Sequence, residues 1–132
     1  MVAVETKDWI DQKGRKNLKT GFAKIVVAKE TKKEAQRFVD NAIEKNSMVN
    51  TDESSGLIDL ENVDVDYQVV GSNQETLDHW LPWVHKFISN AKSWIVGTHH
   101  GVEAKYLNQY LSEYTFRFNR RHDPDSLFFR AL

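Results

Sequence analysis

The sequence predicts an α/β domain in which helices flank a mixed sheet. Short runs rich in β-branched residues indicate strands. Longer segments whose apolar residues recur every three or four positions indicate amphipathic helices. These segments follow in the order strand, strand, helix, strand, strand, helix, helix, which is typical of α/β proteins. A chain of 132 residues is long enough for one core, so we expect a single domain over residues 1–132.

The first three elements are a strand pair and a helix. VAVE (residues 2–5) and FAKIVVAK (22–29) are expected to pair like a hairpin across a polar, glycine-containing segment. The apolar run in the second is typical of a strand covered on both faces. Thr31 and Glu34 then form a possible capping box at the start of a helix. Its apolar stripe consists of Ala35, Phe38, Val39, Ala42 and Ile43.

The second half begins with two strand candidates, residues 47–53 and 66–72, joined by a loop or a single helical turn. In the segment that follows, Pro82 predicts the start of the main helix, because proline is tolerated in a first turn. The sequence GTHHG (97–101) is expected to end this helix. A last helix is expected from Val102 to Asn119, with its tyrosine and leucine face packed in the core.

Composition excludes several classes of protein. The chain has no cysteine, which excludes disulfides and thiolate metal sites and fits a cytoplasmic protein. No apolar run approaches the roughly 20 residues that a membrane span needs, so we expect no membrane partner. A net charge of −1 argues against purely electrostatic binding to nucleic acid.

The charges are nevertheless unevenly distributed. Basic stretches at residues 13–19 and 116–121 flank an acidic stretch at 51–66. This arrangement suits a site that holds metal ions beside a polyanion. Ordinary solvated surface charge is the alternative explanation.

Asp52 is the first candidate for chemistry, because it stands where a predicted strand ends. Ligands bind at that edge in α/β sheets, and oxygen donors suit Mg²⁺ or Mn²⁺. An aspartate that stabilises a turn is the alternative. The histidines, including His99 and His100, lack both the HExxH spacing and the cysteines of a zinc site. We expect His99 and His100 to hydrogen-bond backbone or phosphate groups.

One long stretch resembles a known family. Residues 97–121, GTHHGVEAKYLNQYLSEYTFRFNRR, are similar to the C-terminal signature of a family of bacterial insertion-sequence transposases. Upstream, VNTDESSG resembles the family's Thr-Asp strand end, which implies that Asp52 is the second catalytic aspartate. WVHKFISNAK resembles the branch whose third metal-site residue is asparagine, which implies that role for Asn90.

The resemblance implies an RNase H-like fold and a DNA partner. It also implies DNA cleavage and strand transfer with two divalent cations, Mg²⁺ or Mn²⁺, about 3.5–4 Å apart, in a protein that forms homo-oligomers. Relatives with glutamate carry a lysine seven residues further on, where this chain has Gly97. Lys86 shares the helix face of Asn90, whereas Lys92 lies about 200° around the helix. Both lysines are candidates for assisting catalysis.

The family's first aspartate lies on a strand that should precede VAVE. We therefore expect a fragment that lacks its first strand and is inactive alone. Glu5 and Asp8 are the nearest acids. The alternative function is a non-catalytic folded remnant that acts as a self-association or DNA-binding module.

The arginines after the last helix are candidates for DNA contacts, because guanidinium groups pair bidentately with phosphate. These are Arg117, Arg120 and Arg121, and the resemblance adds Asn119, His99 and His100 to the candidates. Ion pairing with Glu113 or Asp123 at a helix end is the alternative.

Overall fold

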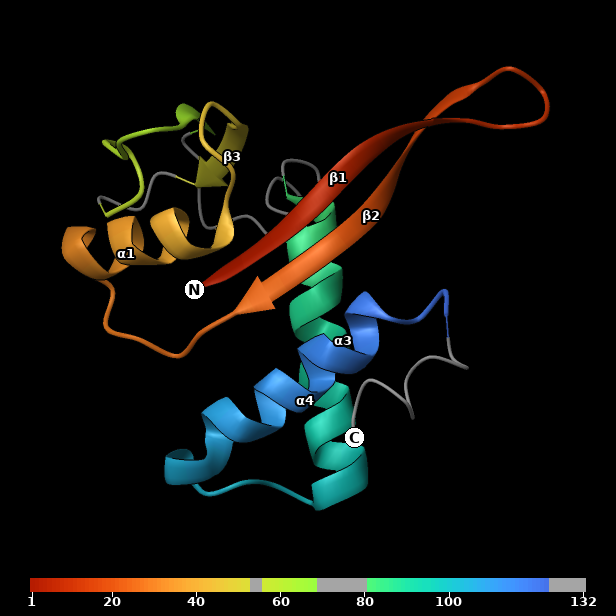
Figure 1. The fold of residues 1–132 in the computed structure, drawn as a ribbon. Helices are drawn as coiled ribbons and strands as arrows, with labels where there is room; N and C mark the ends of the chain where they lie inside the picture. The colour runs from red at the N-terminus through yellow and green to blue at the C-terminus, as the bar shows by residue number, and fades with distance from the viewer. Residues whose placement is uncertain (53–55, 69–80, 124–132) are drawn as a thin grey trace. The chain divides into compact units, whose positions relative to one another are not determined.

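The computed structural model describes residues 1–52, 56–68 and 81–123 of the chain (Figure 1). Its contacts divide the chain into two compact units. The first unit comprises Met1 and Val26–Lys86, and the second comprises Val2–Ile25 and Phe87–Leu132. None of the described helices is long and apolar enough to cross a membrane.

The second unit begins with a long antiparallel hairpin of β1 (Val2–Ile10) and β2 (Lys16–Ile25). Figure 1 shows it as one continuous two-stranded ribbon. The hairpin-like pair is confirmed, but both strands extend further toward the turn than predicted, and residues 26–29 lie outside β2. A local turn explains the difference: the Asp11 carboxylate accepts the backbone N–H groups of Lys13 and Arg15 at 2.8 and 2.9 Å. This turn lets pairing continue through polar residues.

The predicted burial of the second strand on both faces is wrong. Most of β2 is exposed, including Phe22, which is 63% exposed, and Ala23 is its one buried residue. The reason is that β2 belongs to a two-stranded ribbon, which has too few neighbours to cover both faces.

A β-bulge interrupts the hairpin between Val4 and Thr6. The Glu5 carboxylate accepts the backbone N–H of Phe22 at 2.9 Å across the bulge. Gly21 leaves the space for this carboxylate, because a Cβ atom at position 21 would overlap it. The glycine therefore lets the Glu5 carboxylate take the position in which it binds Phe22.

Helix α3 (Pro82–His99) starts at the predicted proline. The prediction that residues 97–101 end it holds only for the last two: the helix continues to His99, and the left-handed residues His100 (φ 53°) and Gly101 (φ 114°) follow. A 3₁₀ turn, η1 (Ala104–Tyr106), then leads into α4 (Leu107–Asn119).

Aromatic packing between α3 and α4 forms the core of the second unit. Phe87 is 2% exposed, and its ring centroid lies 5.2 Å from that of Tyr114 and 4.9 Å from that of Phe118. Leu111 is also buried. The predicted packing role of the aromatic and leucine face of the last helix is confirmed for these residues.

The first unit combines helix α1 (Lys32–Ala42) with strands β3 (Met48–Asp52) and β4 (Asp64–Gln68). The Thr31 hydroxyl accepts the backbone N–H of Glu34 at 3.3 Å, which confirms the predicted N-cap. The two strands are parallel, with Met48 beside Asp64 and Asp52 beside Gln68. Of the strand predicted at 66–72, residues 69–72 lie outside the described residues. The core consists of Ala35, Val39 and Leu60, packed by Met1, Ile43, Leu57, Val63 and Val65.

The α/β class is confirmed, but the expected mixed sheet is not observed. The described residues form two separate two-stranded sheets, one antiparallel and one parallel. In both sheets each strand pairs only with its neighbour in the sequence. The RNase H-like arrangement stays a prediction.

Candidate metal site and DNA-contacting residues

Asp52 is the last residue of β3, as the sequence predicts. It is half-buried and follows the buried Thr51. It borders a cavity of about 260 Å³ in the first unit. The other residues of this cavity are Met1, Ala28, Glu30, Thr31, Ala35, Gly56 and Leu57. The end of β3 therefore places Asp52 at the wall of this cavity.

Two acidic residues, Asp52 and Glu30, line this cavity together with Met1. The Met1 amino group donates a hydrogen bond of 2.7 Å to the Val26 carbonyl. Burial lowers its pKa from the ordinary value, and the negative charge of Glu30 opposes that shift.

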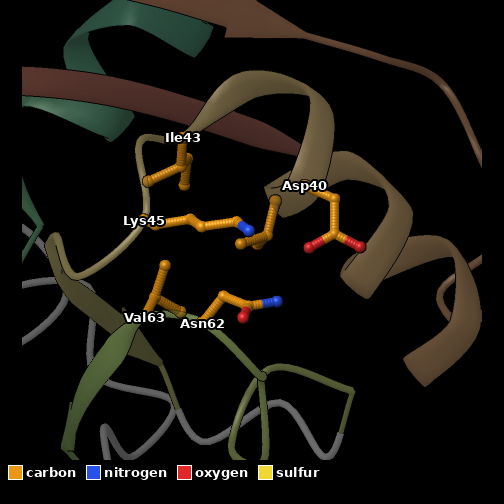
Figure 2. Close-up of a pocket in the computed structure, with 6 residues that line it drawn as sticks. Asp40, Ile43, Lys45, Asn62 and Val63 are labelled. Atoms are coloured by element: carbon orange, nitrogen blue, oxygen red, sulfur yellow. The ribbon is translucent and has the colours of Figure 1, made fainter.

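A second cavity of about 250 Å³ lies elsewhere in the first unit. Figure 2 shows Asp40, Ile43 and Lys45, from the end of α1 and the loop after it, facing Asn62 and Val63. It contains none of the candidate metal-binding, catalytic or DNA-contacting residues. Its two charged residues, Asp40 and Lys45, do not indicate a particular ligand or reaction.

Asn90 lies on α3 with its side chain exposed, as do the two candidate lysines. The Lys86 ammonium lies 4.6 Å from the centre of the Trp83 ring. Lys86 precedes Asn90 by one helical turn, whereas Lys92 projects from a different face. Asp52 belongs to the first unit and Asn90 to the second, and their convergence stays a prediction.

Asn119 and Arg121 bind the backbone of β2. The Asn119 carboxamide accepts the N–H of Ala23 at 2.7 Å and donates to its carbonyl at 2.9 Å. The Arg121 guanidinium donates to the carbonyls of Thr20 at 2.7 Å and Gly21 at 3.2 Å, and to the Thr20 hydroxyl at 2.8 Å. These bonds give both side chains a structural role at the edge of β2.

The other two arginines also have partners within the chain. Arg117 forms an ion pair with Glu113 at 2.9 Å, the alternative that the sequence left open. Arg120 donates to the Phe116 carbonyl at 3.3 Å, and its guanidinium lies 3.7 Å from the centre of the Phe116 ring. Arg117 remains well exposed, whereas Arg120 is half-buried. Their roles in DNA contact stay predictions.

The two candidate histidines differ in their surroundings. The His99 ring lies 4.4 Å from the ring of Tyr110 and 5.0 Å from that of Trp94, between centroids. His100 is exposed just after α3. In this arrangement His99 packs among aromatic rings, and only His100 faces solvent freely enough to meet a phosphate without rearrangement.

Comparison with known families decides the identity of the chain. The family model described as the ISXO2-like transposase domain matches residues 1–119. The chain belongs to this transposase family. Neither a curated protein nor a solved structure gave a match. The resemblance to insertion-sequence transposases is thereby confirmed, and the match includes Asp52, Asn90 and Asn119.

We tested whether the side chains of this transposase domain fit the two cations that the resemblance implies. Among the residues that the structure describes, no three His, Cys, Asp or Glu side chains converge. The cavity beside Asp52 is lined by two acidic residues, Asp52 and Glu30. A two-cation centre needs more oxygen donors than this, so the cavity residues do not fit one by themselves.

Sequence reasoning missed the part of the transposase domain that joins α4 to the hairpin. Asn119 was identified only by resemblance, and Thr20 and Gly21 were not identified at all. Their partners lie about a hundred positions away in the chain, and no local pattern marks such pairs. A glycine within a strand was the one available signal, since it often marks a bulge or a close approach.

Proposed function

We propose that this ISXO2-like transposase domain takes part in metal-dependent DNA cleavage and strand transfer, with Asp52 and Asn90 holding Mg²⁺ or Mn²⁺. The family match over residues 1–119 carries the proposal. The position of Asp52 supports it, because a half-buried carboxylate at a strand end beside a cavity suits a hard cation. Asn90 would add an uncharged carbonyl oxygen.

The donor set implies weak binding of metal by this chain. Asp52 carries the only negative charge in the two family positions, because Asn90 is uncharged. A cation there gains less than it would among several carboxylates. We therefore expect low affinity for Mn²⁺, and little strand transfer by the isolated chain.

Calorimetric titration with Mn²⁺ tests this proposal. We expect weak binding by the wild type that is lost in Asp52→Asn, which removes the charge with little change in shape. Asp66→Asn is the matched control, because Asp66 is an exposed strand carboxylate of the same unit. Equal Mn²⁺ affinity in the wild type and Asp52→Asn would overturn the assignment.

A second candidate function is a non-catalytic module that self-associates or binds DNA. Within the described residues the outer edge of β1 has no strand partner, and Trp9 and Ile10 near its end are 45% and 63% exposed. Unpaired edges of this kind favour pairing with another chain. Dependence on metal distinguishes the two functions. A non-catalytic module should form its complexes equally well in the wild type and in the Asp52→Asn variant.

A further inference from the structure

We propose that one face of the β1–β2 hairpin is a DNA-binding surface, which contacts the phosphate backbone through Lys7, Lys19 and Lys24. This inference rests on the proposed function in one respect, that the ligand is DNA. It does not require a metal ion or the convergence of Asp52 and Asn90.

The pairing register places these lysines on a common face. Lys7 lies directly opposite Lys19, and Lys24 lies opposite Ala3. Residues directly opposite across an antiparallel pair share a face, and so do alternate residues of one strand. We call this the basic face, and it also carries Glu5, Trp9 and Asn17. The other face of the outer hairpin carries Asp8, Ile10, Lys16 and Leu18.

The two faces differ in charge. Three lysines and one glutamate give the basic face a net charge of about +2, whereas Lys16 and Asp8 cancel on the other face. Like charges directly opposite each other weaken a strand pair, so Lys7 opposite Lys19 does not serve the stability of the hairpin. An anionic partner that binds both lysines would offset this repulsion.

The lysines have donors available for such a partner. Within the described parts of the chain, Lys19 and Lys24 form no ion pair, and both are exposed. Lys7 lies 3.3 Å from the Glu5 carboxylate and 5.6 Å from the centre of the Phe22 ring. This exposed pair is weak, and a phosphate can share the Lys7 ammonium with Glu5.

The hairpin is held at one end and open at the other. Asn119 and Arg121 bind β2 at Thr20, Gly21 and Ala23. From Glu5 to Lys19 every residue except the half-buried Asp11 is exposed. A two-stranded ribbon with both faces in water is marginally stable by itself, whereas such a ribbon fits the major groove of duplex DNA. Trp9, 45% exposed on the basic face, adds apolar surface beside the lysines.

Charge favours DNA over a second copy of the chain as the partner of this face. A second copy would bring the same excess of positive charge to the interface. The opposite face, with the exposed Ile10 and Leu18, is the one suited to an apolar contact.

The test compares Lys19→Gln with Lys16→Gln. Both lysines are exposed residues of β2, three positions apart, and they project from opposite faces. Binding of a fluorescently labelled 20-base-pair duplex (an assumed length of about two helical turns) is followed by anisotropy over a series of KCl concentrations, with EDTA present to exclude metal.

Each lost phosphate contact should reduce the slope of log affinity against log salt by about 0.9. We expect that reduction for Lys19→Gln, about twice that for Lys7→Gln/Lys19→Gln, and none for Lys16→Gln.

Urea unfolding of each variant excludes loss of structure as the cause. Removing Lys7 or Lys19 relieves repulsion, so neither substitution should lower stability. Equal slopes for Lys19→Gln and Lys16→Gln would overturn the inference and leave the proposed function standing. A wild type that binds no duplex at low salt would also overturn it, while the Mn²⁺ titration of Asp52→Asn would still decide the metal site.

Discussion

At the scale of single residues, Asn119 replaces a strand at the outer edge of β2. Its carboxamide presents one donor and one acceptor, as a peptide group does, and pairs with both backbone groups of Ala23. Arg121 binds two further carbonyls of β2, those of Gly21 and Thr20. The two side chains satisfy an edge that would otherwise be open to another chain.

Asn119→Ala should therefore lower the free energy of unfolding by about 1–3 kcal/mol, because it leaves the N–H and carbonyl of the buried Ala23 unpaired. Asn119→Asp should not rescue stability, since it sets a carboxylate oxygen against the Ala23 carbonyl. Urea denaturation followed by circular dichroism measures both changes.

Gln109→Ala, at an exposed position of the same helix, is the control, and its free energy of unfolding should stay within about 0.5 kcal/mol of the wild type. A similarly small change in Asn119→Ala would show that the edge pairing is dispensable.

These same residues show where prediction from sequence ended. The N-cap at Thr31 and the helix start at Pro82 were predictable, because each depends on neighbours within one turn of helix. The partners of Asn119 and Arg121 depend on chain segments that meet only in the folded unit. The arginines were singled out because guanidinium groups bind phosphates, but they also donate to backbone carbonyls, and the sequence does not distinguish the two partners.

At the scale of elements, the turn between β1 and β2 determines the length of the hairpin. The Asp11 carboxylate accepts two backbone N–H groups and pairs with the Arg15 side chain at 2.8 Å. These bonds lower the pKa of Asp11 from its ordinary value, with the backbone N–H of Arg15 as the largest cause. A turn was expected in this polar, glycine-containing segment, but its exact position was not. The polar residues on either side of it do not form a strand pattern, which is why both strands were predicted too short.

The lowered pKa predicts how the turn responds to acid. A carboxyl whose pKa is lower in the folded state stabilises that state above its unfolded pKa of about 3.9. The stabilisation is lost as the pH falls through the folded value. NMR titration of Asp11 should therefore give a midpoint below the ordinary range. Arg15→Ala should raise that midpoint only in part, because both backbone donors remain; a full return to the ordinary value would show that the side chain alone is responsible.

At the scale of the whole molecule, the family match extends over elements of both units, from β1 to α4. The sequence assigned the transposase family correctly through one long stretch, residues 97–121. It also placed Asp52 at the end of a strand. It could not show whether Asp52 and Asn90 meet, because nothing local to either position specifies the distance between them.

The central claim is that Asp52 and Asn90 face the same cation. Paramagnetic broadening of the backbone amide NMR signals by substoichiometric Mn²⁺ tests it most directly, since a weakly bound ion exchanges rapidly and marks every residue near its site. We predict that the signals around Asp52 and Asn90 broaden together and that both effects disappear in Asp52→Asn. Broadening near Asp52 without Asn90, or broadening that survives Asp52→Asn, would contradict the claim.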